Sequence, residues 1–236
     1  MLAIPILLAV AIAGEADHPA LAGSGELGLV IARGNSSTET LNAKLALRRE
    51  GATWRHEAVL SALKSRKDGV DAADRRELAL KSDFRRDQPR YGFAALRLEQ
   101  DDFAAYRWQS SLAVGLGWRL IEDDQRKLAL EAGPGLRRAA LARSGGSGGG
   151  ATEEDLILRG SLHYRQQISE TAELYDEALV EAGSDNTHLK NDLGLKVRIN
   201  DRLALKASVA VRHNSTAPPQ AKRTDTLSSL NLAYEF

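Results

Sequence analysis

The sequence contains no cysteine among its 236 residues. This absence excludes disulfide bonds, thiolate metal ligands and a cysteine nucleophile. The 32 basic residues balance the 32 acidic ones, so no excess positive charge favours nucleic acid as a partner. No internal apolar run approaches the roughly 18 residues of a membrane-spanning helix. A helical membrane protein is therefore excluded, whereas a transmembrane β-barrel is not, because its strands alternate apolar with polar residues.

Signals for metal and nucleotide binding are also missing. His18, His56, His163 and His188 are scattered along the chain without metal-ligand spacing. The glycine-rich stretch at 145–150 lacks the Lys-Ser/Thr pair that closes a phosphate-binding loop. Neither a metal nor a cofactor is predicted.

The N-terminus is the one continuously apolar segment. Residues 2–13 are almost wholly apolar, and Ala11-Ile12-Ala13 and Ala20-Leu21-Ala22 each match a small-x-small cleavage site followed by glycine. This pattern predicts a signal peptide over residues 1–22 and a single mature domain over residues 23–236. No Lys or Arg precedes the apolar run. A truncated signal is therefore favoured, with a short buried segment as the alternative.

From Ser24 onward the chain is a succession of segments with period-two alternation. The clearest runs from Trp108 to Leu120, with Leu112, Val114 and Leu116 on the same face as both Trp108 and Trp118. The two tryptophans lie about 33 Å apart at about 3.3 Å per residue. With a strand tilt of about 40°, the separation of the tryptophans along the membrane normal falls to about 25 Å. This is the height of the lipid-facing band between the aromatic girdles of an outer-membrane barrel.

About twelve such segments follow one another through hairpins. Connections near Gly51, Gln88, Asp123, Ser169 and Asp201 are short, and those between them are mostly longer, including a polar loop at residues 66–75. An even strand count, short turns on one side and longer loops on the other are typical of outer-membrane barrels. The sequence therefore predicts an all-β, antiparallel, up-and-down transmembrane barrel of about 12 strands, monomeric, in the outer membrane of a Gram-negative bacterium.

The last eleven residues, 226–236, form the expected final strand. Leu230, Leu232, Tyr234 and Phe236 share its apolar face. A terminal strand that ends in Phe resembles the signal by which the barrel assembly machinery recognises its substrates, and we expect Tyr234 and Phe236 to act as that signal. The alternative is an edge strand of a soluble β-sandwich, where half-buried strands also alternate.

Two further sets of residues follow from strand parity. Aromatic residues expected at the membrane interfaces are Trp54, Trp108, Trp118, Tyr164 and Tyr234. Charged residues expected on the inward faces are Lys81, Asp83, Arg97, Glu99, Arg107, Arg119, Lys127, Glu131, Arg137, Arg159, Arg165, Glu173, Glu177, Glu181, Lys190, Lys196 and Arg198. Twelve strands lie between the side-chain-filled eight-stranded barrel and the open porins. The charges are expected either to pair and rigidify the barrel or to line a narrow passive route for ions and small solutes.

One motif offers an enzymatic alternative. Parity puts His213 and Ser215 on the outward face near the external end, where an outer-membrane lipid or lipid A hydrolase would meet its ester. No Asp or Glu on a neighbouring outward face orients the histidine, so the triad is incomplete. An interfacial histidine followed by turn-forming residues is the simpler interpretation, and a non-enzyme is predicted.

Several blocks, in order, carry a resemblance to a known family: Gly25-Glu26-Leu27-Gly28, Leu80-Lys81-Ser82-Asp83, Gly183-Ser184-Asp185-Asn186-Thr187 and Val211-Arg212-His213-Asn214-Ser215. From about Gly25 to Phe236 the chain resembles the YdiY-like outer-membrane proteins, labelled as salt-induced and as a domain of unknown function. The resemblance implies a barrel surrounded by outer-membrane lipid and lipopolysaccharide. By its label alone it implies a link to osmotic stress, and it supplies no substrate or catalytic residue.

Overall fold

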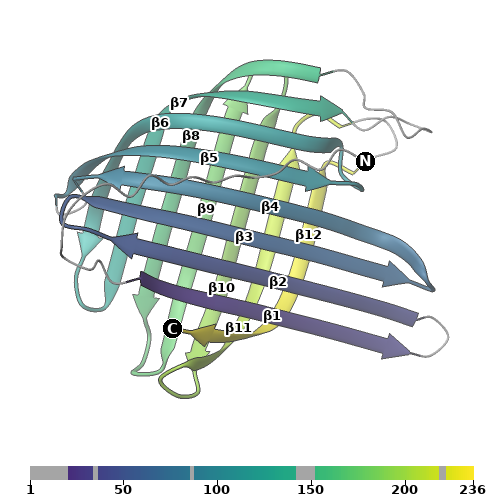
Figure 1. Cartoon of the computed structure of the whole chain (residues 1–236), viewed down its shortest axis with the longest axis horizontal. Helices are drawn as coiled ribbons and strands as arrows, with labels where there is room; N and C mark the ends of the chain where they lie inside the picture. Colours follow the sequence, from purple (N-terminus) through teal and green to yellow (C-terminus); the bar gives the residue numbers. More distant parts are fainter. Residues whose placement is uncertain (1–20, 34–36, 86–87, 142–151, 218–221) are drawn as a thin grey trace.

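The computed structural model describes residues 21–33, 37–85, 88–141, 152–217 and 222–236. These residues form twelve antiparallel strands, each paired with its neighbours in the chain, and β1 also pairs with β12 to close the barrel (Figure 1). The strands are β1 (Leu21–Arg33), β2 (Ser37–Glu50), β3 (Trp54–Lys67), β4 (Val70–Phe84), β5 (Arg90–Asp101), β6 (Tyr106–Glu122), β7 (Arg126–Leu141), β8 (Thr152–Gln167), β9 (Ala172–Gly183), β10 (Thr187–Arg198), β11 (Leu203–Asn214) and β12 (Thr224–Glu235). The predicted twelve-stranded up-and-down barrel is confirmed. Within the described residues, no helix has the length and apolar character needed to cross a membrane.

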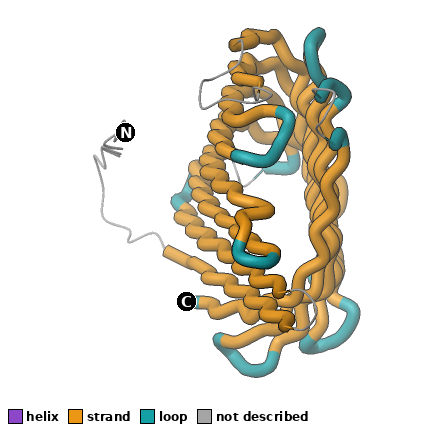
Figure 2. Tube along the Cα trace, turned by 90° about the vertical axis from the view of Figure 1, so that its right-hand side faces the viewer, coloured by secondary structure: helices purple, strands orange, loops and turns teal. Residues whose placement is uncertain are grey.

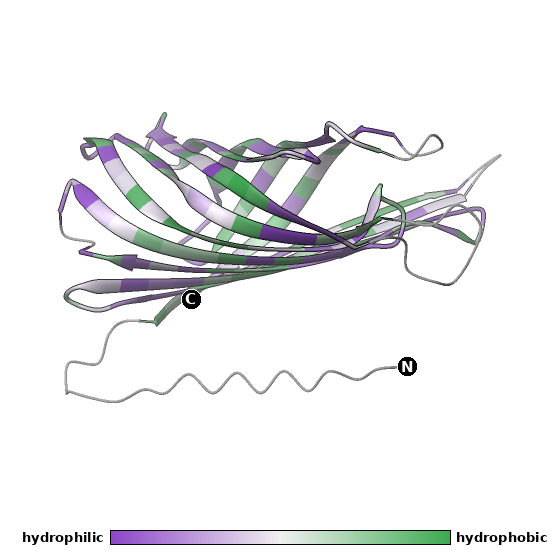
Figure 3. Cartoon of the chain, turned by 90° about the horizontal axis from the view of Figure 1, so that it is seen from above, coloured by the Kyte–Doolittle hydropathy of each residue, from purple (hydrophilic) through white to green (hydrophobic). Residues whose placement is uncertain are grey.

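Hydrophobic and hydrophilic residues alternate along the strands (Figure 3). Many large apolar side chains are exposed, whereas charged ones such as Glu131 and Glu181 are buried. Leucines are paired across five consecutive strands, and their shared outward face forms one row. This leucine row consists of Leu80, Leu96, Leu112, Leu136 and Leu156. Leu156 is 76% exposed, and Leu136 and Leu112 are also more than half exposed. Each large apolar side chain left in water forgoes about 1.5–3 kcal/mol of burial free energy, so the row favours a lipid environment.

The predicted polar loop at residues 66–75 is wrong. These residues extend β3 and β4, which are joined by a turn of only Asp68 and Gly69. Both have positive φ, 51° for Asp68 and 80° for Gly69, as a type I′ hairpin turn requires. The Asp68 carboxylate also accepts a hydrogen bond of 2.7 Å from the Ser37 backbone N–H. The charged residues that looked like a loop belong to strand ends that project beyond the leucine row.

The predicted short turn at Asp123 is present and is held by its own side chain. The Asp123 carboxylate accepts hydrogen bonds from the backbone N–H groups of Arg126, at 2.6 Å, and Gln125, at 3.0 Å. These bonds, with the Arg126 guanidinium, lower the pKa of Asp123 below its ordinary value because they stabilise the ionised form.

The first strand begins at Leu21, so it includes the last two residues of the predicted signal peptide. The cleavage site after residue 22 stays a prediction. The rest of that predicted signal lies outside the described residues, as does the glycine-rich stretch at 145–150.

Closure of the barrel is confined to one end of the seam between the first and last strands. Residues 24–27 of β1 pair with residues 232–235 of β12, and the ladder stops at Leu27 and Leu232. Beside these pairs, Gly23 and Phe236 exchange two backbone hydrogen bonds of 2.8 and 2.9 Å. The ladder does not continue beyond them, although Gly28 still lies against Leu230 and Asn231 of β12. In Figure 1 the end of β12 runs beside β1 near the C-terminus. Seen from the side, two layers of strands face each other across the interior (Figure 2).

The lumen as candidate functional site

One side of the lumen, between β5 and β8, is filled by side chains. Tyr91, Phe93 and Ala113 form one buried cluster, and Ala105, Tyr106 and Ala139 form another. In the same region β6 and β7 approach each other closely, because Gly115 and Gly133 carry no side chains. A Cβ on Gly133 would lie 2.6 Å from the Gly115 Cα, well inside contact distance.

A continuous chain of ion pairs crosses the lumen. Its three carboxylates and three cations alternate in the order Glu181, Arg97, Glu99, Arg212, Glu77 and Lys190, and we call this set the ion-pair chain. The five N···O distances are 2.5, 3.0, 2.7, 2.8 and 2.6 Å in that order. The carboxylates and Arg97 are buried, so each desolvated charge depends on its neighbours for compensation. The set ties β4 and β5 to β9, β10 and β11 across the barrel.

A second buried group surrounds Glu131 on β7. Its carboxylate pairs with Lys81 and with Arg159, the latter at 3.1 Å. It also accepts hydrogen bonds from the Tyr91 hydroxyl at 2.8 Å and from the Ser161 hydroxyl at 2.9 Å. Four donors thus satisfy one buried carboxylate, as a charge removed from water requires.

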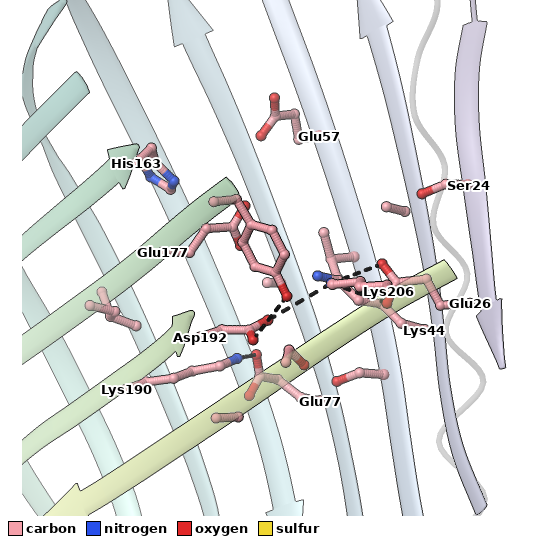
Figure 4. Close-up of a pocket in the computed structure, with 18 of the residues that line it drawn as sticks. Ser24, Glu26, Lys44, Glu57, Glu77, His163, Glu177, Lys190, Asp192 and Lys206 are labelled. Atoms are coloured by element: carbon pink, nitrogen blue, oxygen red, sulfur yellow. Dashed lines mark hydrogen bonds and ion pairs between the residues drawn. The ribbon is translucent and has the colours of Figure 1, made fainter. Parts of the chain in front are cut away.

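A third group lies closer to the seam (Figure 4). The Lys206 ammonium is 3.1 Å from the Glu26 carboxylate, 3.9 Å from that of Asp192 and 4.6 Å from the centre of the Tyr175 ring. The Tyr175 hydroxyl donates to Asp192 at 3.2 Å. Nearby Lys44 points into the same cavity, where its charge interacts with the Glu177 carboxylate.

A cavity of about 1710 Å³ runs along the side of the barrel that these clusters leave open. Its lining includes Arg165, Lys196 and Asp201 near the short turns, and Arg75 and Phe103 near the opposite end. The cavity therefore extends from one mouth of the barrel to the other, past the ion-pair chain.

Most of the predicted inward charges lie inside the barrel. The cavity is lined by Lys81, Arg97, Arg119, Lys127, Arg159, Arg165, Glu173, Glu177, Glu181, Lys190 and Lys196. Four others are buried in the filled region beside the cavity: Asp83, Glu99, Glu131 and Arg137.

Two inward assignments do not agree with the structure. A register shift between Tyr106 and Trp108 turns Arg107 outward, where its guanidinium meets Asp102 at 3.8 Å. Tyr106 occupies the buried position instead, because a bulge reverses strand parity on one side of it. Arg198 is exposed beyond the cavity and donates to the Glu170 carbonyl in the turn before β9.

Several lumen residues were missing from the predicted set, although parity was sufficient to find them. Glu77 and Arg212 belong to the ion-pair chain, and Glu26 and Lys206 to the group near the seam. Each occupies the inward phase of its strand. Their roles were not visible in the sequence because period two gives the face of a residue but not its partner on the opposite wall.

The predicted interface aromatics lie toward strand ends. Trp108 and Trp118 are near opposite ends of β6, while Trp54 begins β3, where its ring stacks on His56 at 5.8 Å. Tyr164 donates to Gln166 at 2.8 Å. Tyr234 stacks on Phe236, with 6.2 Å between ring centres.

The enzymatic motif is not assembled into a catalytic pair. His213 Nδ1 lies 2.8 Å from the Thr224 hydroxyl. The Ser215 hydroxyl accepts the Thr187 N–H at 2.8 Å and donates to the Asn186 side chain at 3.3 Å. Each of the two side chains thus has a local structural partner, and no contact joins them among the described residues. In the same residues, no group of three His, Asp or Glu side chains is arranged to hold a metal ion.

Comparisons with known proteins agree with this fold. An uncharacterized protein, YdiY, from Escherichia coli (strain K12) is 24% identical over 226 residues, which cover 93% of this chain and 87% of that protein. An outer membrane channel from Pseudomonas putida F1 has a TM-score of 0.53 at 10% identity, covering 95% of this chain and 100% of that chain. The translocator domain of the autotransporter NalP from Neisseria meningitidis has a TM-score of 0.49 at 15% identity, covering 92% and 87%.

The family model identifies the family of the chain. Residues 25–236 match the family described as "Protein of unknown function, DUF481", which confirms the resemblance to YdiY-like proteins. The chain therefore belongs to the DUF481 family and folds as an antiparallel twelve-stranded β-barrel.

Proposed function

We propose that the barrel is a narrow passive channel for ions and small polar solutes. The observation that carries this proposal is the cavity of about 1710 Å³ whose lining reaches both mouths of the barrel. The similarity to the Pseudomonas putida F1 outer membrane channel is one of fold and adds no substrate.

The width and charge of the passage limit what it could conduct. The ion-pair chain bridges the lumen and narrows the cavity, which is also lined by β1 to β3 and β12. Acidic and basic side chains alternate along this route, including Glu57, Lys44, Glu177 and Lys206 (Figure 4). A lumen with interleaved charges of both signs favours small hydrated ions over large solutes and gives weak charge selectivity.

Single-channel recording in planar bilayers tests the proposal. The native barrel should give discrete conductance steps. Ser61→Trp places an indole on the open side of the lumen, where Ser61 lines the cavity, and should reduce the step size by more than half. Leu60→Trp is the matched control, because the adjacent Leu60 faces outward and is 52% exposed.

The two substitutions separate conduction from folding. Equal conductance in both variants, or a silent native barrel that is correctly inserted, would contradict the channel proposal.

We also propose that the leucine row contacts outer-membrane lipid and lipopolysaccharide and that the barrel acts as a monomer. A link to osmotic stress stays a prediction from the family label.

A further inference from the structure

Aromatic rings gather on the outward face of the barrel at one end of β3 and β4. Trp54 of β3 is paired with Phe84 of β4 in the ladder, and the centres of their rings are 4.9 Å apart. The Trp54 ring also stacks on His56, with 5.8 Å between ring centres. Trp54 and Phe84 are 47% and 39% exposed. Such rings are typical of the level at which a membrane protein meets the lipid head groups.

Three arginines extend this group of rings along β2 to β6. Arg49 of β2 is paired with His56 in the ladder, and Arg90 of β5 is paired with Trp118 of β6. Arg85 follows β4 directly, and its guanidinium lies 5.6 Å from the centre of the Phe84 ring. Each arginine therefore neighbours an outward-facing ring. We call these residues the belt arginines: Arg49, Arg85 and Arg90.

The backbone of Arg85 supports this placement. Its φ is 61°, in the left-handed region that residues with a Cβ seldom adopt. The guanidinium nevertheless lies over the ring of Phe84, on the outer wall of the barrel. A conformation of this kind is retained where the surrounding structure or a function requires it.

The belt arginines differ from outward-facing arginines at the opposite end of the barrel. There, Arg76 pairs with Asp74 at 3.2 Å, Arg138 with Glu154 at 3.2 Å and Arg107 with Asp102 at 3.8 Å. Within the ranges that the structure describes, no belt arginine has a carboxylate oxygen within 4.0 Å. The belt thus carries a net positive charge, whereas the other end has its outward charges balanced.

The acidic residues in the turns beside the belt are engaged elsewhere. Glu50 pairs with Arg55 at 2.9 Å. The Asp123 carboxylate accepts the backbone N–H groups of its own turn. Glu122 and Asp124 line the cavity, on the lumen side of the wall. An anion from outside the chain is therefore the fitting partner for the belt arginines.

The position of the belt indicates where that anion comes from. The ten-residue connection between β7 and β8, at 142–151, lies at the opposite end of the barrel. Outer-membrane barrels carry their longer loops outside and their short turns in the periplasm, so the belt belongs to the periplasmic leaflet. Arginine forms strong, often bidentate hydrogen bonds to phosphate oxygens. Anionic lipids are also drawn to basic side chains at a membrane surface.

We propose that the belt arginines bind the phosphate groups of anionic phospholipids in the periplasmic leaflet. The aromatic rings pack against the upper part of the acyl chains, and the three guanidinium groups hold the heads. The site lies on the outer wall of the barrel and is separate from the proposed passage. It rests on the proposed contact of the leucine row with membrane lipid.

Tryptophan quenching by brominated lipids tests this site, because the chain has three tryptophans and two of them lie in the belt. Phosphatidylcholine vesicles contain a minor fraction of phosphatidylglycerol, and bromine is carried by the acyl chains of either lipid at equal mole fraction. In Trp108→Phe, which keeps Trp54 and Trp118, brominated phosphatidylglycerol should quench at least about twice as strongly as brominated phosphatidylcholine. In Trp54→Phe/Trp118→Phe, the remaining Trp108 near the other end of β6 should be quenched equally by both.

Charge variants in the Trp108→Phe background identify the groups responsible. Arg49→Gln/Arg85→Gln/Arg90→Gln should bring the ratio of quenching by the two lipids down to about one, since no cation is left to favour the anionic head. The matched control is Arg76→Gln/Arg107→Gln/Arg138→Gln, which removes three outward guanidinium groups at the opposite end and should leave the ratio unchanged. High salt should lower the ratio without any substitution.

The possible failures can be told apart. A native barrel that does not insert into these vesicles would contradict the lipid contact of the leucine row, and this site with it. An inserted barrel whose belt tryptophans are quenched equally by both lipids, or whose ratio survives loss of the belt arginines, would overturn only this site. None of the six arginines lines the cavity, so conductance should be the same in both sets of variants. A silent barrel with selective quenching would contradict only the channel.

Discussion

The Arg97 guanidinium reaches across the lumen to the Glu181 carboxylate, with 2.5 Å between Nη2 and Oε2. The two residues are separated by 84 positions in the chain, and both are buried. Arg97→Met removes the cation while keeping much of the side-chain volume, and it leaves Glu181 without this partner. We expect the free energy of unfolding in detergent, measured with urea, to fall by about 3–5 kcal/mol.

Arg165→Met provides the control for this prediction. Arg165 also pairs with a lumen carboxylate, Glu177, at 3.4 Å, but its side chain is 47% exposed. Its loss should cost about 0–1 kcal/mol, because solvent screens the pair. Adding Glu181→Gln to Arg97→Met should recover part of the lost stability. Similar costs for the two arginines would show that the cross-lumen pair has no special role.

Glu77 offers a test of charge in the passage. Its carboxylate forms ion pairs with both Lys190 and Arg212, and the residue lines the cavity. Glu77→Gln removes one negative charge while leaving two cations in place, so the reversal potential in a salt gradient should shift toward anion preference. Glu154→Gln on the exposed outer face is the matched control and should leave the reversal potential unchanged. A shift of equal size in both variants would contradict a role for Glu77 in conduction.

The close approach of β6 and β7 predicts intolerance at one glycine. A methyl group on Gly133 would lie 2.8 Å from the Val114 carbonyl carbon and 2.6 Å from the Gly115 Cα. Gly133→Ala should therefore cost about 1–3 kcal/mol through backbone shifts, seen as a lower urea midpoint. Gly25→Ala is the control, because nothing lies within 4 Å of its added methyl group. If both alanines are tolerated equally, the approach of the two strands is looser than described.

The terminal aromatic predicts an assembly defect. Phe236 contributes two backbone hydrogen bonds to Gly23 at the closed end of the seam. Deleting it should reduce the heat-modifiable, folded fraction in outer membranes while export to the periplasm continues. Phe103→Ala, which changes an exposed aromatic residue elsewhere, should leave that fraction unchanged. Normal insertion of the deleted form would exclude Phe236 as part of the assembly signal.

Strand number, strand order and most inward charges could be predicted from the sequence, because period-two alternation determines which face a residue occupies. Arg107 could not be placed, since a bulge shifts the phase without leaving a mark in the pattern. The pairing of Arg97 with Glu181 was equally invisible, because it depends on the relative heights of β5 and β9 across the barrel. Residues 66–75 were predicted as a loop because they are polar. A strand end that projects beyond the membrane needs no apolar face, so it lacks the alternation that identifies a strand.

The uneven filling of the lumen has a mechanical consequence. Between β5 and β8, packed aromatic side chains and buried ion pairs brace the wall from within, whereas β1 and β12 are joined by a short ladder at one end. Lateral tension in the membrane would therefore act on a stiff shell with one compliant edge. We expect a stretched bilayer to widen that edge first, while the braced side keeps its curvature.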